Sequence, residues 1–254
     1  MPTVGITCVP FYPAMETHFQ PTVADLEAIE GGLDGLIFAS PGNPTGSMMP
    51  AAQMAELADY CEGRGIRMIS DEIYHGIVFD SDVPQTTALA HSRHAIAINS
   101  FSKYYSMPGW RLGWMVVPDY LVEPITNLAH NLYICPPAAS QIGALAALDC
   151  RDELDRHVVR YKRNRDLLVK EMPSLGFDRF TAPQGAFYLY CHVEHLHEDS
   201  IKFAIELLEN CGVLITPGSD FSPRHGHHFL RFSYAGATED IEEAIARIRK
   251  WRSG

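Results

Sequence analysis

The chain has 254 residues, enough for one large domain or two smaller ones; 46% of them are hydrophobic and 20% are charged. This composition is typical of a globular protein with a sizeable core. The net charge of −11 argues against nucleic acid and anionic membrane as partners, since both attract a basic surface. Six scattered cysteines, no membrane-length apolar run and no signal-like N-terminus predict a reduced, cytoplasmic protein without a membrane span.

Short apolar runs alternate with helical segments over the first half of the chain. We expect strands at 6–9, 35–39, 66–69, 95–99 and 112–117, and helices at 21–29 and 48–62. Thr22 is the expected N-cap of the first helix. Strands that alternate with crossover helices indicate a parallel α/β sheet.

From residue 138 onward the pattern changes. We expect helices at 138–148, 153–172, 200–211 and from Thr238, which would cap the last one, and strands at 185–190, 213–216 and 229–233. The chain therefore divides into two predicted parts. Residues 1–137 would form the large domain with the parallel-type sheet, incomplete at its N-terminus, and residues 138–254 a smaller α+β domain that shares a long helix with it.

Lys103 lies on the loop that follows the strand expected at 95–99. An ammonium without a partner is costly there, so it should have a chemical role or face solvent. Small hydroxyls lie next to it at Ser100 and Ser102, and Arg111 follows. A lysine that can be desolvated suits a Schiff base with a phosphorylated aldehyde, whose phosphate Ser100 and Arg111 would hold. The alternative is a surface lysine, with Arg111 paired elsewhere.

Polar side chains also follow the other strands, at the edge where open α/β sheets bind ligands. Asn43, Asp71 and Tyr74 lie at such strand ends. With Lys103 they form a set that suits pyridoxal 5'-phosphate: Asp71 would keep the ring nitrogen protonated, and Asn43 and Tyr74 would hydrogen-bond the ring hydroxyl. Each also has a simpler explanation, because Asn43 can be a turn residue, Asp71 a loop cap and Tyr74 a core residue.

Five motifs together resemble the class I/II pyridoxal-phosphate-dependent aminotransferases of the fold-type-I superfamily. They are Ser-Pro-Gly-Asn-Pro-Thr-Gly at 40–46, Asp-Glu-Ile-Tyr at 71–74, Ser-Phe-Ser-Lys at 100–103, Gly-Trp-Arg-Leu-Gly at 109–113 and Phe-Leu-Arg-Phe-Ser-Tyr at 229–234. The resemblance implies a ping-pong transaminase in which Lys103 and Asp71 are catalytic and Arg231 grips the substrate carboxylate.

The resemblance also implies amino acid and 2-oxo acid substrates and a homodimer. It leaves the donor open, because no second basic residue can be assigned to a side-chain carboxylate. It further implies a missing front part, which in relatives carries the first strand, a phosphate-binding loop and a ring-stacking aromatic, and hence a gap or an exposed edge in the sheet.

Two other functions share these residues. One is a lyase or decarboxylase of the same superfamily, although Arg231 favours substrates that keep their carboxylate. The other is a truncated, non-catalytic remnant. Three histidines, His225, His227 and His228, invite a metal site, but no cysteine or carboxylate lies at ligand spacing, so we expect a solvated loop and no metal.

Overall fold

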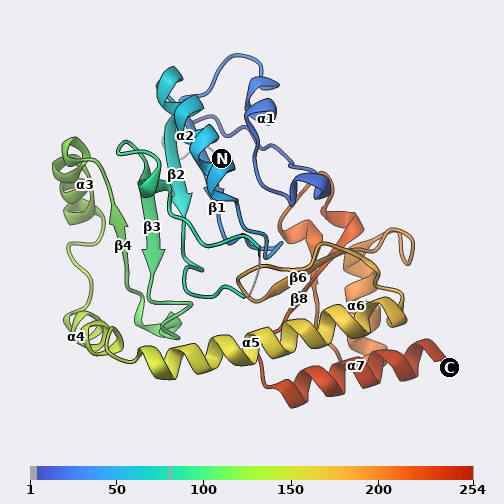
Figure 1. Ribbon diagram of the computed structural model, residues 1–254. Helices are drawn as coiled ribbons and strands as arrows, with labels where there is room; N and C mark the ends of the chain where they lie inside the picture. Colours follow the sequence, from blue (N-terminus) through green and yellow to red (C-terminus); the bar gives the residue numbers. More distant parts are fainter. Residues whose placement is uncertain (1–4, 80–81, 254) are drawn as a thin grey trace.

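A computed structural model describes residues 5–79 and 82–253 of the chain (Figure 1). Up to residue 132 its elements are η1 (Met15–Thr17), α1 (Val23–Glu27), β1 (Gly35–Ala39), α2 (Ala51–Arg64), β2 (Arg67–Asp71), η2 (Ala88–Ala90), β3 (Ile96–Ser100), η3 (Pro108–Trp110), β4 (Gly113–Val116) and α3 (Asp119–Leu132). The later elements are α4 (Ala138–Ala147), α5 (Arg151–Glu171), η4 (Met172–Leu175), β5 (Arg179–Phe180), β6 (Tyr188–His192), α6 (Ser200–Cys211), β7 (Thr216–Pro217), η5 (Gly218–Asp220), η6 (Gly226–His228), β8 (Phe229–Ser233) and α7 (Thr238–Ser253).

The first sheet has the strand order β1-β2-β3-β4. The pairs β1–β2 and β2–β3 are parallel, and the pair β3–β4 is antiparallel. The predicted α/β class with a parallel-type sheet is therefore confirmed. One face packs against α2, and Leu36, Leu57 and Met68 are buried in the core between them. The four strands pair without a gap, so β1 and β4 are the edges.

The opposite face of this sheet carries Asp71 and is open. The strand register places Ile37, Ile98 and Met115 on the same face as Asp71. These three side chains are 69%, 37% and 47% exposed. Parallel sheets are as a rule covered on both faces, so a second layer is absent here from the described residues.

The second sheet has the order β5-β6-β8-β7, and all of its pairs are antiparallel. Helices α5, α6 and α7 pack against it around one core, in which Phe177, Leu189 and Leu230 are fully buried. Figure 1 shows α5 running past both sheets, with α7 beside its second half. The long helix expected at 153–172 is thus found as α5.

The two halves are joined by more than α5. Tyr74, Ile77 and Phe79 follow β2 of the first sheet but belong to the core of the second. A β-bridge pairs Val78 with Gly185 across the same junction. The division at residue 137 stays a prediction. Within the described residues no helix combines the length and apolar character that crossing a bilayer requires.

The strand expected at 6–9 is wrong. These residues have no regular structure, and Ile6 and Val9 are 65% and 49% exposed. An apolar run becomes a strand only where a sheet edge accepts it, and in the described residues this run pairs with no other strand.

Helix α3 was not predicted. Pro124 lies inside it and none of its residues is buried, so the sequence reads there as an interrupted segment. All the helices that were predicted are confirmed within a few residues at each end. Thr22 caps α1 in a capping box as expected. Thr238 is the first residue of α7, and its hydroxyl donates a hydrogen bond to Asn164 Oδ1 at 2.7 Å.

Two strand boundaries shift. The strand expected at 185–190 is found at Tyr188–His192, because the chain turns first at Ala186, whose φ is 57°. The strand expected at 213–216 is reduced to Thr216–Pro217. The strands expected at 35–39 and 229–233 are found at those residues.

Candidate active site

The predicted strand-end residues do gather at one edge of the first sheet. Asp71 and Ser100 are the last residues of β2 and β3, and Asn43 lies in the turn after β1. Because β4 is antiparallel, Arg111 just ahead of it lies at the same edge. The parallel register, with Ala39 opposite Asp71, fixes this arrangement.

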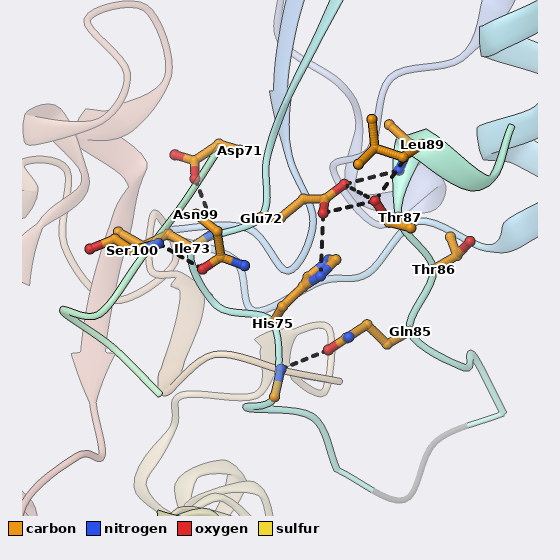
Figure 2. A network of polar contacts seen from close by, with 12 residues as sticks. Asp71, Glu72, Ile73, His75, Gln85, Thr86, Thr87, Leu89, Asn99 and Ser100 are labelled. Atoms are coloured by element: carbon orange, nitrogen blue, oxygen red, sulfur yellow. Dashed lines mark hydrogen bonds and ion pairs between the residues drawn. The ribbon is translucent and has the colours of Figure 1, made fainter. Parts of the chain in front are cut away.

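Asp71 is half-buried on the open face of the sheet. Its Oδ1 accepts a hydrogen bond from the Ile73 amide at 3.1 Å, as Figure 2 shows. Burial raises the pKa of the Asp71 carboxyl, and this outweighs the lowering by that hydrogen bond and by the positive charge of Lys103. One carboxylate oxygen, Oδ1, is therefore engaged in a hydrogen bond, and the described residues compensate the negative charge only in part.

Lys103 lies in the turn that follows β3. Its Nζ is 5.7 Å from the ring centroid of Tyr74 and 5.9 Å from that of Phe187. In the part of the chain that the structure describes, no hydrogen bond or ion pair engages this Nζ. The amine thus faces two aromatic rings and is free to react.

Tyr74 is buried, and its hydroxyl lies 2.9 Å from that of Tyr188. Burial raises the pKa of Tyr74, and the hydrogen bond to Tyr188 adds to this. The positive charge of Arg231 acts in the opposite direction. Tyr74 is therefore a neutral hydroxyl that can donate or accept a hydrogen bond beside Lys103.

Arg231 lies on β8, in the second sheet, and reaches the first. Its Nη1 donates to Asn43 Oδ1 at 2.8 Å, and its Nη2 donates to Thr216 Oγ1 at 3.2 Å. The guanidinium lies over the rings of Tyr188 and Phe221, 4.3 and 4.6 Å from their centroids. Its Nε is buried and has no hydrogen-bond partner in the described residues. This planar cation is held in place, and no carboxylate of the described residues forms an ion pair with it.

The expected phosphate end is only partly assembled. Ser100 Oγ lies 2.8 Å from Ser102 Oγ and 3.2 Å from the Leu112 carbonyl. Arg111 is exposed, and its Nη1 donates to the Pro108 carbonyl at 2.9 Å. Hydroxyls are thus gathered, but the structure does not bring the Arg111 guanidinium into hydrogen-bonding contact with Ser100.

Sequence reasoning missed four residues that contact the site. Tyr188, Phe187 and Thr216 contact Tyr74, Lys103 and Arg231 as described above, and Glu72 is the buried residue next to Asp71 in sequence. No spacing signal marks the first three, which come from the second half of the chain. Glu72 lies inside the motif at 71–74, but the sequence does not show that its side chain is buried.

A cavity of about 300 Å³ lies beside this edge and is lined in part by His75, Asn99 and Tyr104. These residues are sequence neighbours of Tyr74, Ser100 and Lys103, whereas Lys103, Asp71 and Arg231 do not line the cavity. The candidate site therefore opens on the uncovered face and not into this cavity.

The histidine-rich segment forms no metal cluster in the described residues, where no three His, Cys, Asp or Glu side chains are placed to share an ion. His228 Nε2 instead lies 3.6 Å from Glu194 Oε1, and its ring is tilted by 46° against that of His227. All six cysteines are unpaired, and three of them are buried.

With this geometry in place, comparison with known proteins is informative. The family model described as "Aminotransferase class I and II" matches residues 3–248. A valine–pyruvate aminotransferase of Mycobacterium tuberculosis is 44% identical over 251 residues, which are 98% of this chain. An aspartate aminotransferase of Sulfurisphaera tokodaii is 30% identical over 96% of the chain.

Solved structures show the same relation. An aminotransferase from Mycobacterium tuberculosis superimposes with a TM-score of 0.92 at 42% identity, covering 98% of this chain and 63% of that one. One from Silicibacter pomeroyi, described as a putative aminotransferase, gives 0.88 at 48% identity, covering 94% and 64%. The chain also spans 63% of the length of the two curated relatives.

Proposed function

Because the chain belongs to the class I and II aminotransferases, we propose that it moves an amino group between an amino acid and a 2-oxo acid, with pyridoxal 5'-phosphate held on Lys103. The observation that carries this proposal is the Lys103 amine, which has no hydrogen-bond or ion-pair partner among the described residues and lies at the same strand edge as the Asp71 carboxylate.

The residues present fit this cofactor at its ring end. The set offers an amine for the aldehyde, a free carboxylate oxygen for the ring nitrogen and a buried hydroxyl at Tyr74 for the ring oxygen. The Ser100 and Ser102 hydroxyls are the donors available to the phosphate. Arg111 would join them by leaving the Pro108 carbonyl, a rotation that its exposure allows.

When bound, the cofactor supplies an aldehyde that condenses with amines and a protonated ring that withdraws electrons. Lys103 Nζ would hold it and would also be the group that carries the proton of the substrate carbon. Asp71 would stabilise the positive charge on the ring nitrogen, and its partly buried position would make that interaction stronger than in water.

Arg231 would bind the α-carboxylate of the substrate. Its guanidinium is clamped between Asn43 and Thr216 and supported by two aromatic rings, so it is oriented before the substrate arrives. Since a 44% identical relative is named as acting on valine and pyruvate, we take L-valine and pyruvate as the first pair to test.

We further propose that full activity needs the Asp71 face to be covered. Ile37, Ile98 and Met115 are exposed around the carboxylate, and water there weakens its charge. The relatives contain residues beyond those that this chain matches, and equivalent residues would form the cover. The same proposal includes a homodimer of this chain, as the resemblance implies.

The experiment is covalent trapping. The chain is mixed with pyridoxal phosphate, reduced with borohydride and digested, and the modified lysines are identified by mass spectrometry. We expect Lys103 to be modified at least about tenfold more than Lys250, an exposed lysine on α7. Equal labelling of the two lysines overturns the proposal.

Activity is measured as alanine formed from L-valine and pyruvate. Lys103→Ala should lower the rate by about 10²- to 10⁴-fold, whereas Lys250→Ala should leave it unchanged. If Lys103→Ala keeps wild-type activity, another residue performs the chemistry.

A further inference from the structure

Glu72 follows Asp71 directly, yet the two carboxylates point in opposite directions. Figure 2 shows Asp71 on one side of the chain and Glu72 extending the other way, towards residues 86–89. Glu72 is only 5% exposed, which makes it a buried carboxylate that the chemistry described so far does not use. A buried anion is tolerated only where donors surround it.

Donors from two segments meet this carboxylate. Thr87 Oγ1 lies 2.9 Å from both of its oxygens, and the Ala88 amide donates to Oε1 at 2.9 Å. His75 Nδ1 lies 3.4 Å from Oε2. Burial lowers the pKa of His75, which favours a neutral ring as the third partner. Glu72 therefore ties the turn that carries Asp71 and Tyr74 to the segment 85–90.

The segment 85–90 is itself anchored. Thr87 caps η2, and Ala88 is fully buried in the core shared with α2 and β2. A second link runs in parallel, since Gln85 Oε1 accepts a hydrogen bond from the Gly76 amide at 2.8 Å. The turn from 71 to 79 thus lies between two cores: Tyr74, Ile77 and Phe79 pack into the second, and Glu72 fastens the turn to the first.

We propose that Glu72 is a positioning residue of this site, whose buried carboxylate, held by Thr87 and Ala88, fixes the turn that presents Asp71 and Tyr74 to the cofactor. The proposal rests on the proposed function, because what it positions matters only if the cofactor binds there. It predicts that Thr87 acts through Glu72, although Thr87 faces away from the site.

The test compares Glu72→Ala, Thr87→Val and the double variant, with Glu72→Gln as the conservative change and Glu56→Ala as the control. Glu56 is an exposed glutamate on α2. Each variant is first shown to be folded by circular dichroism. The Kd of pyridoxal phosphate and the amino-transfer rate at saturating cofactor are then measured, and hydrogen exchange of residues 71–79 is followed without cofactor.

We expect Glu72→Ala and Thr87→Val each to raise the cofactor Kd about tenfold, and the double variant to be no worse than the first, because both break one linkage. Glu72→Gln keeps an acceptor for Ala88 and should recover most of the affinity. Exchange at 71–79 should become faster in Glu72→Ala and stay unchanged in Glu56→Ala.

A Kd and an exchange rate within twofold of wild type in Glu72→Ala overturn the proposal. So do additive effects in the double variant, which would mean that Thr87 and Glu72 act separately. If the wild-type chain binds no cofactor at all, the proposed function fails, and the exchange measurement alone then decides whether Glu72 fixes the turn.

Discussion

Strands β8 and β4 are each the last strand of their sheet along the chain, but they differ in what covers them. In β8, Leu230 is fully buried and Phe232 is 6% exposed, with helices and neighbouring strands around them. In β4 all four residues are exposed, including Trp114 at 39% and Val116 at 46%. Helices α3 and α4 beside it also present apolar side chains to solvent.

This difference shows where stability and chemistry reside. The second sheet is covered by helices, and hydrogen bonds hold its Arg231 in place. The first sheet instead carries Asp71 and Ser100 on an uncovered face, with Lys103 in the turn after Ser100. The contacts with Asn43 and Thr216 thus orient Arg231 within the described residues. The position of Asp71 depends on the turn at 71–79 and on whatever covers the open face.

The largest change in the free energy of unfolding is expected when one apolar side chain is truncated in the covered core and, for comparison, one on the open face. Phe177→Ala removes a fully buried ring from the closed core and should lower the free energy of unfolding by about 3–5 kcal/mol. Ile37→Ala removes a side chain that is 69% exposed and should change it by less than about 0.5 kcal/mol. Urea unfolding measures both, and equal losses would show that the open face is covered in solution.

A polar change gives the next largest effect. Asn164 is fully buried on α5; its Nδ2 donates to the carbonyls of Tyr234 and Gly236, and its Oδ1 accepts from Thr238. Asn164→Ala should lower the free energy of unfolding by about 1–3 kcal/mol, because those partners are left buried without hydrogen bonds.

Its matched control is Asn131→Ala on α3, an exposed residue whose amide donates to the carbonyl of Asn127 in its own helix. That change should stay within about 0.5 kcal/mol. A loss at Asn131 as large as that at Asn164 would place α3 in a packed environment and contradict the comparison.

The same contrast explains how far the sequence alone could lead. Elements whose apolar pattern matches what covers them, such as α6 and β8, were predictable, and so were the strand-end residues Asp71 and Lys103. The segment at 6–9 and α3 were not, because their structure depends on partners that the local pattern does not name. Three site contacts, Tyr188, Phe187 and Thr216, come from the distant half of the chain, and only the folded arrangement brings them to Lys103 and Arg231.

The exposed helix α3 provides a test with little effect on stability. Leu128 and Leu132 are 58% and 71% exposed, next to further apolar residues of α3 and α4. Contiguous apolar surface promotes association. Leu128→Lys with Leu132→Lys should change the free energy of unfolding by less than about 0.5 kcal/mol and weaken self-association in sedimentation. Leu214→Lys, at a residue that is 83% exposed in the closed half, is the control.

If the α3 variant sediments as the wild type does at every concentration, this face mediates no association between copies. If the Leu214 variant weakens association equally, the effect comes from added charge and not from the α3 surface.

The smallest expected effect concerns Asp71 without cofactor. Burial raises the pKa of its carboxyl above the value in the unfolded chain. Its contribution to stability is therefore complete below the unfolded pKa and is lost as the pH rises through the folded pKa. At neutral pH the ionised carboxylate opposes folding, and Asp71→Asn, which keeps the oxygen that accepts from Ile73, should be slightly more stable than wild type. In acid, below the unfolded pKa, the difference should vanish.

Pyridoxal phosphate should reverse this order at neutral pH. A ligand that binds only the folded chain adds stability in proportion to its affinity, and the carboxylate of Asp71 is what attracts the protonated ring. Wild type should then gain more from the cofactor than Asp71→Asn does in urea unfolding at equal cofactor concentration. An equal gain in both would mean that the ring does not meet Asp71, and that the charge on the open sheet face has a role other than holding the cofactor.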